Sequence, residues 1–179
     1  GVIAIIITIM VLELKIPRGA NLVDLVQVLP ILGSYVVSFL YLAIYWNSHH
    51  HLLQATERIS GGVLWANFFL LFWLSLFPFG TAWVHQAGLN AQGPMVAYGI
   101  ILLMAGIGYW IMLRVLLRVH EQDSTLHQAI GSNRKENISL VLYMVGIVAA
   151  LKAPLVSASI YLLVAFIWLV PDRRIEKAL

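Results

Sequence analysis

Thr8 is the first residue of this chain whose side chain could do chemistry, and it lies on an otherwise apolar stripe. If residues 1–16 form a helix, the spacing i, i+3, i+4 and i+7 places these side chains on one face: Ile5, Thr8, Ile9 and Leu12. The hydroxyl of Thr8 can offer its oxygen to a partly dehydrated cation or to a neighbouring helix. The stripe therefore allows two interpretations, a packed seam between helices or a narrow, dry pore.

Three consecutive histidines, His49, His50 and His51, form the other candidate for chemistry. Neighbouring side chains on a helix point about 100° apart, so at most one or two of these rings can serve the same metal. Hydrogen bonding at a helix end near the membrane surface is the favoured interpretation. Metal or haem ligation and pH sensing stay open as alternatives.

Little else in the sequence suggests catalysis. There is no serine–histidine–aspartate set beyond isolated residues and no glycine-rich phosphate loop, and the chain has no cysteine. The sequence therefore predicts a protein that is not an enzyme and has no cofactor. An ion-coupled transporter of small solutes remains an alternative, although such transporters commonly place a carboxylate or histidine in mid-membrane, where this sequence has no charged residue.

Composition indicates the class of protein. Of 179 residues, 61% are hydrophobic and 11% are charged, and the mean hydropathy is +0.88. A soluble domain carries about 25% charged residues, so the sequence predicts a membrane protein surrounded by lipid. The net charge of +3 is distributed between apolar runs, which argues against nucleic acid as a partner.

The elements that must position these residues are membrane-spanning helices, each of about 20 mostly apolar residues. We predict an all-α, polytopic fold in which 1–179 form a single domain of six helices. Their predicted ranges are about 1–16, 25–46, 63–84, 95–117, 138–152 and 155–170. Pro78 and Gly80 should distort the end of the third helix, and Pro154 divides the last apolar region in two. The abrupt start leads us to expect further residues before Gly1.

Basic residues predict the orientation. With six alternating spans, one side receives only Lys15, Arg18 and Lys152. The other side receives Arg58, Arg114, Arg118, Arg134, Lys135, Arg173, Arg174 and Lys177. Basic residues favour the cytoplasmic side, so both termini should be cytoplasmic in a multi-pass protein of the cell membrane.

Small and polar residues within the apolar runs are expected to close helix–helix contacts. In membranes, hydroxyl and amide groups usually bond a neighbouring helix or backbone, and glycines allow close approach. The residues concerned include Ser34, Ser38, Asn67, Ser75, Ser157, Ser159, Gly99, Gly106 and Gly108.

A set of short motifs runs along the whole chain. They are the opening run 1–15, Tyr35-x-x-Ser38-Phe39, Trp46-x-x-His49-His50, Leu64-Trp65-x-Asn67, Ser75-Leu76-x-Pro78-Phe79 and Trp168-x-x-Pro171-Asp172-Arg173-Arg174-Ile175-Glu176. In this order they resemble the transmembrane protein 175 family, the prokaryotic relatives of the lysosomal potassium channel. The resemblance implies a potassium-selective channel in a prokaryotic inner membrane.

The resemblance also implies an assembly. Family members with one six-helix unit form homotetramers in which the first helix lines a central pore without the Thr-Val-Gly-Tyr-Gly filter of ordinary potassium channels. By match to the first-helix motif, Ile5 would be the tightest hydrophobic constriction and Thr8 the layer tied to potassium preference. Ile9 and Leu12 would continue the apolar lining. A bundle of this size has no room for its own aqueous channel, so a pore requires several copies around an axis.

Two further sets of residues are expected to support the pore. Trp46 with His49 or His50, together with Asn67, would belong to a polar network that holds the first helix in register. Glu13 could concentrate cations at the pore mouth, or it could pair with a nearby cation, Lys15 or Arg18.

Overall fold

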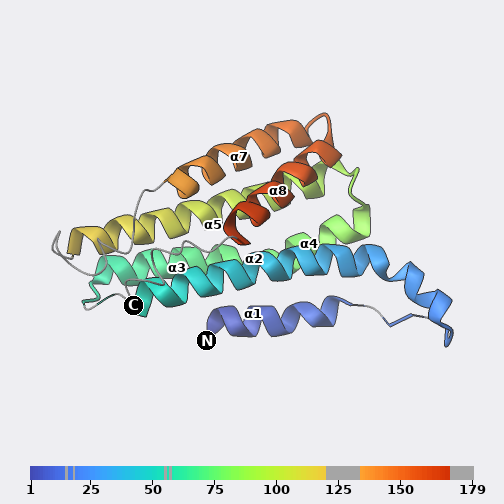
Figure 1. Ribbon diagram of the computed structural model, residues 1–179, viewed down its shortest axis with the longest axis horizontal. Helices are drawn as coiled ribbons and strands as arrows, with labels where there is room; N and C mark the ends of the chain where they lie inside the picture. The colour runs from blue at the N-terminus through green and yellow to red at the C-terminus, as the bar shows by residue number, and fades with distance from the viewer. Residues whose placement is uncertain (15, 18, 55, 57, 120–133, 170–179) are drawn as a thin grey trace.

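The described part of the protein is entirely helical. The computed structural model describes residues 1–14, 16–17, 19–54, 56, 58–119 and 134–169, without the side chains of residues 13 and 27, and no strand occurs within these ranges (Figure 1). The helices are α1 (Val2–Met10), α2 (Leu29–Gln54), α3 (Gly61–Ser75), α4 (Phe77–Ala87), α5 (Gln92–Val119), α7 (Arg134–Ala150) and α8 (Pro154–Leu169). The prediction of an all-helical protein is confirmed.

The first helix is shorter than the predicted range 1–16. α1 ends at Met10, one 3-10 turn follows over Val11–Glu13, and Leu14 is already extended, with ψ of 109°. Pro17 lies just beyond. Proline disfavours helical backbone at the residue before it, so the helix must end before this point.

The second helix is displaced towards the C-terminus relative to the predicted range 25–46. A 3-10 helix over Leu22–Gln27, with a capping box formed by Asn21 and Asp24, takes the place of its expected first turn. α2 then continues to Gln54. The prediction that the helix ends near Trp46 was wrong, because no helix breaker follows and Leu52 is buried in the core.

The third predicted helix, 63–84, consists of two helices. α3 and α4 meet at Leu76, and Pro78 lies in the first turn of α4. Proline has no N–H to donate and its ring crowds the carbonyl four residues earlier, which explains the break. Together the two helices form an apolar segment, Gly61–Ala87, that is long enough to cross a membrane.

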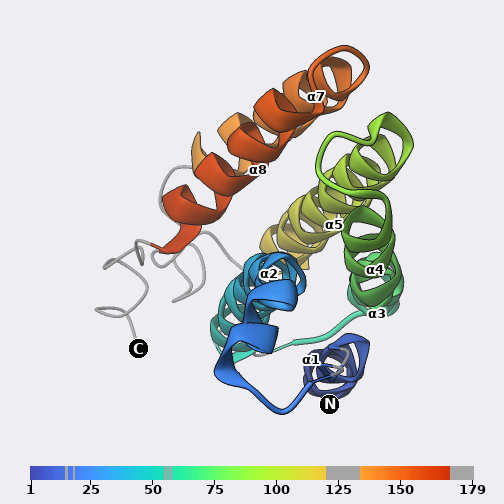
Figure 2. The ribbon, with the colours of Figure 1, turned by 90° about the vertical axis from the view of Figure 1, so that its right-hand side faces the viewer.

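Two other helices are also long and apolar enough to cross by themselves, α2 and α5, while α8 is a shorter apolar helix. α5 lies between α3 and the α7–α8 pair, and α1 packs on α2, α3 and α4 (Figure 2). The ends of α2 and α5 and the starts of α3 and α7 lie towards the left of Figure 1, where α1 also begins.

Aromatic side chains form the centre of the bundle. Tyr41 donates a hydrogen bond to the carbonyl of Tyr161, and the rings of Tyr143 and Tyr161 lie 6.4 Å apart. A Cβ added at Gly99 or Gly146 would collide with Tyr161. These glycines therefore let a tyrosine from α8 enter between α5 and α7, in agreement with the close approach expected at Gly99.

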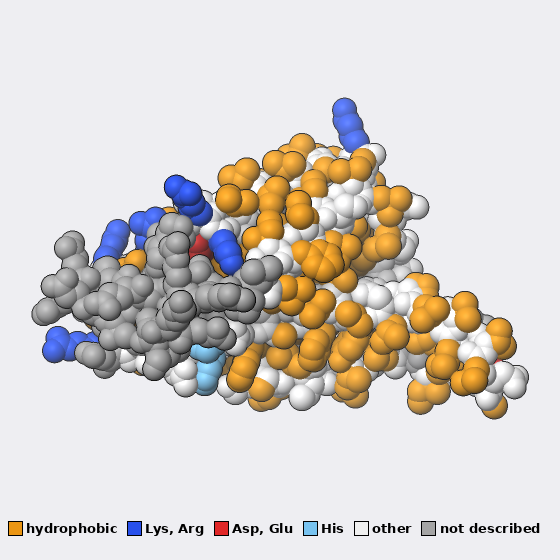
Figure 3. Space-filling view, in the orientation of Figure 1, with side chains coloured by type: hydrophobic (Ala, Val, Ile, Leu, Met, Phe, Trp, Pro, Cys, Tyr) orange, Lys and Arg blue, Asp and Glu red, His pale blue; other side chains and the backbone are white. Residues whose placement is uncertain are grey.

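The outer surface suits a lipid environment. Large apolar side chains are exposed along the helices, including Trp65, Phe72 and Phe166, and they cover most of the face shown in Figure 3. Basic side chains gather mainly at the left-hand end of that view. Arg114, close to the end of α5, lies 5.0 Å from the ring centroid of Trp110.

Candidate functional site

Helix α1 has one packed face and one outward face. Ile3 and Met10 are 3% and 1% exposed, and they pack with Ile6 against the rest of the chain. In contrast, Ile5 is 59% exposed, and Leu12, in the 3-10 turn that follows α1, is 78% exposed. The predicted stripe therefore lies on the face that the chain itself does not cover, with Thr8 and Ile9 exposed beside these two residues.

The hydroxyl group of Thr8 has a defined orientation. Its oxygen Oγ1 donates a hydrogen bond to the carbonyl of Ile5 at 2.8 Å. A hydroxyl carries one hydrogen and two acceptor lone pairs. Because the hydrogen is used within the helix, the exposed oxygen can only accept, and it can therefore contact a cation.

The histidine cluster divides into separate contacts. Nε2 of His49 lies 2.8 Å from Oδ1 of Asn67 and connects α2 to α3. The ring of His50 instead stacks on Trp46, with 5.2 Å between centroids and 4° between planes. Both pairs line a cavity of about 450 Å³ that also contacts Gly1, Val2 and Ile3. The structure thus brings all four predicted network residues to the start of α1.

No metal centre emerges from these contacts. Within the described ranges, no group of three histidine, cysteine, aspartate or glutamate residues is placed to hold a metal ion. The rings of His50 and His51 meet edge to face, with 61° between their planes. The side chain of Glu13 lies outside the described part, as do Lys15 and Arg18.

Known proteins match the part of the chain that contains α1 and the histidine contacts. The family model for the endosomal/lysosomal potassium channel TMEM175 matches residues 1–78, which contain α1 and both histidine contacts. A protein named as a potassium channel in Chryseobacterium sp. (strain P1-3) is 49% identical over 179 residues, covering 100% of this chain and 93% of that protein.

This chain belongs to the TMEM175 family.

More distant TMEM175 relatives share the length and the fold. A potassium channel of Chamaesiphon minutus is 27% identical over 156 residues, covering 81% of this chain and 77% of that protein. The crystal structure of a lysosomal potassium-selective channel TMEM175 homologue from Chamaesiphon minutus matches with a TM-score of 0.77 at 24% identity. This match covers 95% of this chain and 92% of that one. The relatives' names thus describe channels rather than enzymes.

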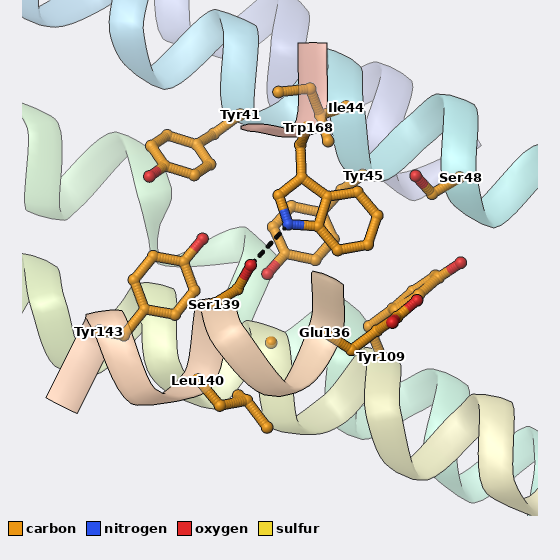
Figure 4. A pocket seen from close by; sticks show the side chains of 11 residues that line it. Tyr41, Ile44, Tyr45, Ser48, Tyr109, Glu136, Ser139, Leu140, Tyr143 and Trp168 are labelled. Carbon is orange, nitrogen blue, oxygen red and sulfur yellow. Dashed lines mark hydrogen bonds between the residues drawn. The ribbon is translucent and has the colours of Figure 1, made fainter. Parts of the chain in front are cut away.

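Sequence reasoning missed the buried tyrosines. Four of them, Tyr41, Tyr45, Tyr109 and Tyr143, line a small chamber between α2, α5, α7 and α8 (Figure 4). In this chamber the indole N–H of Trp168 donates to Oγ of Ser139 at 2.8 Å. The chamber measures about 30 Å³, room for about one or two water molecules. All seven tyrosines stand in predicted or observed apolar helices. Since a buried tyrosine hydroxyl usually requires a partner, their number was a signal of an internal polar network.

Proposed function

We propose that this chain is one subunit of a homotetrameric, potassium-selective channel whose pore is lined by α1 from each copy. The observation that carries the proposal is the outward face of α1. It presents an apolar stripe with an exposed hydroxyl at Thr8, while the opposite face is packed. Four such stripes around an axis would enclose a path that one chain cannot enclose alone.

The same proposal includes six membrane crossings, made by α1, α2, the α3–α4 pair, α5, α7 and α8. Three apolar segments of sufficient length support it, and tilt or thinning of the bilayer can accommodate shorter helices. The concentration of basic side chains at one end supports an orientation with that end, and both termini, in the cytoplasm of a prokaryotic cell.

In this pore, Ile5 forms the hydrophobic constriction. A ring of isoleucine side chains narrows the path and can close it by excluding water, and opening requires the helices to move apart. Ile9 and Leu12 continue the apolar lining. Their exposure in the single chain supports this role, since packed side chains could not face a pore.

Thr8 forms the layer that prefers potassium. Its hydroxyl hydrogen is bonded to the Ile5 carbonyl, so four copies would direct acceptor lone pairs towards a passing ion. Such a ring replaces part of an ion's hydration shell, and potassium gives up water more readily than sodium. Because few oxygens take part, we expect modest selectivity. The sequence contains no Thr-Val-Gly-Tyr-Gly segment that could supply a carbonyl filter.

The remaining predicted residues support the pore without lining its constriction. The His49–Asn67 and Trp46–His50 contacts lie where α1 begins, and we propose that they hold α1 in register. Glu13 is proposed at the pore mouth. The channel needs no cofactor, and potassium is the permeating ion.

Replacement of Thr8 tests this function. We expect Thr8→Ala to lower the potassium-to-sodium permeability ratio severalfold in planar bilayers, measured as a shift of the reversal potential with potassium and sodium on opposite sides. Thr56→Ala is the matched control, because Thr56 makes the same type of hydroxyl-to-carbonyl bond, to Leu52 at 2.7 Å, outside α1. An unchanged reversal potential in Thr8→Ala would contradict the assignment of Thr8.

A further inference from the structure

The outward side of α5 changes from apolar to basic along the helix. Counting from the exposed Ile100, the residues at i+3, i+4 and i+7 are apolar and partly exposed. Trp110, Arg114 and Arg118 continue the same side, because an α-helix has 3.6 residues per turn. This surface, from Ile100 to Arg118, is the outer face of α5. None of its residues belongs to the pore proposed on α1.

Arg114 lies within the apolar segment that is long enough to cross a membrane, Gln92–Val119. It precedes the end of that segment by about 7.5 Å along the helix axis. An arginine at such a depth commonly extends its charge towards water. Arg114 instead folds back, and its Cζ lies 5.0 Å from the ring centroid of Trp110, one turn earlier in the helix. Its charge is therefore directed towards the apolar part of the outer face.

A guanidinium group in this position favours an anion beside it. Within the part of the chain that the structure describes, neither Arg114 nor Arg118 forms an ion pair with a carboxylate. The ring of Trp110 attracts the Arg114 cation but does not neutralise its charge. An unpaired charge is costly in apolar surroundings. Because the chain supplies no carboxylate here, a negatively charged ligand from the surroundings would remove this cost.

The spacing and chemistry of the two arginines fit a phosphate group. Residues four apart on a helix have Cβ atoms about 5–6 Å apart, so the side chains of Arg114 and Arg118 can reach one group together. A guanidinium binds phosphate through two parallel N–H bonds. The apolar part of the outer face suits a hydrocarbon chain that continues from this phosphate. A phospholipid has both parts, and the two positive charges favour a headgroup of net negative charge.

We propose that the outer face of α5 binds an anionic phospholipid. The phosphate lies between Arg114 and Arg118, and an acyl chain follows the apolar part of the face towards Ile100. Other basic side chains gather mainly at the left-hand end of Figure 3, the end at which α5 finishes in Figure 1, and they raise the local concentration of anionic lipid. The site does not depend on the role proposed for α1.

Native mass spectrometry of the purified full chain in detergent tests the site, with dioleoylphosphatidylglycerol and dioleoylphosphatidylcholine as the probes. The two lipids have the same acyl chains and differ in the net charge of the headgroup. We expect the anionic lipid to bind about tenfold more tightly, because two arginines interact with its charge. Soluble glycerol phosphate at the same concentration should not displace it, because that anion has no acyl chain to place on the apolar part of the face.

Single variants locate the binding site. Arg114→Gln and Arg118→Gln should each weaken binding of the anionic lipid about fivefold and leave binding of the zwitterionic lipid unchanged. Both side chains are exposed, so the fold should persist in both variants. Lys152→Gln is the matched control. It removes the same charge from an exposed position in the turn between α7 and α8, and it should leave the affinity for both lipids unchanged.

Three results would overturn the proposal. Equal affinities of the two lipids for the unmodified chain would show that the face does not select an anionic headgroup. An equal loss of affinity in Lys152→Gln and Arg114→Gln would show that the net charge of the chain, and not a site on α5, attracts the lipid. Displacement of the lipid by glycerol phosphate at the same concentration would show that the arginines bind a soluble phosphate instead.

Discussion

Helix α1 and the aromatic core between α2, α5, α7 and α8 are held in different ways. α1 packs through apolar side chains, Ile3, Ile6 and Met10. In the core, hydrogen bonds add to packing, as between the Tyr41 hydroxyl and the Tyr161 carbonyl. Apolar contacts can slide without leaving buried polar groups unpaired, whereas a hydrogen-bonded core cannot. The difference suits a helix that moves against a fixed frame, as a gate at the proposed constriction requires.

Overfilling the aromatic core is the strongest test of this difference between α1 and the core. A Cβ at Gly146 already collides with the ring of Tyr161, whereas one at Gly33 meets open space. Overpacking commonly costs about 1–3 kcal/mol and occasionally more, and for Gly146→Leu we expect about 3 kcal/mol or more. Thermal unfolding and gel filtration in detergent measure the loss, with Gly33→Leu as the control for the same substitution. Equal melting temperatures in the two variants would show that the core is not tightly closed.

The next test compares the two faces of α1 itself. Ile6 is buried and Ile5 is exposed, so Ile6→Ala should lower the free energy of unfolding by about 2–4 kcal/mol. Ile5→Ala should cost less than about 1 kcal/mol. Ile5→Ala should instead raise the single-channel conductance, because a methyl group narrows the constriction less than the side chain of isoleucine.

Melting curves and single-channel recordings of both variants separate these effects. A conductance in Ile5→Ala equal to that of the unmodified channel would place the constriction elsewhere. Equal losses of stability in the two variants would mean that both faces of α1 are packed, and the contrast between α1 and the core would disappear.

The sequence predicted features that depend on neighbouring residues. The helical class follows from the apolar runs, and the distortion near Pro78 follows from the chemistry of proline. The i, i+3, i+4, i+7 spacing grouped the stripe on one face. The structure exposes Ile5 on the outward side of α1 and Leu12 in the 3-10 turn that follows. The roles proposed for these residues remain predictions, because the choice between seam and pore depends on other copies of the chain.

Features that depend on distant residues could not be predicted. Ser38 bonds to Tyr98, which lies 60 residues away in the chain, and Thr81 lies 43 residues away. Periodicity along one helix contains no information about such partners. The extent of α2 was also missed, because burial of Leu52 by other helices continues the helix beyond Trp46.

The last test concerns the contact between His49 on α2 and Asn67 on α3, which lies beside the start of α1. His49→Ala removes the partner of the half-buried Asn67 oxygen, 2.8 Å from Nε2 of His49, and should cost about 1–2 kcal/mol. Asn67→Ala should cost a similar amount, and the double variant should cost about 1 kcal/mol less than the sum, because the shared contact is lost only once. If the cost of the double variant equalled the sum of the two single costs, the contact would contribute nothing to stability.

Amide hydrogen exchange gives a sharper readout of the His49–Asn67 contact, because the pair lines the cavity at the start of α1. In His49→Ala we expect faster amide exchange in α1 but not in α5. Loss of the His49–Asn67 contact should make α1 more mobile and leave the aromatic core unchanged.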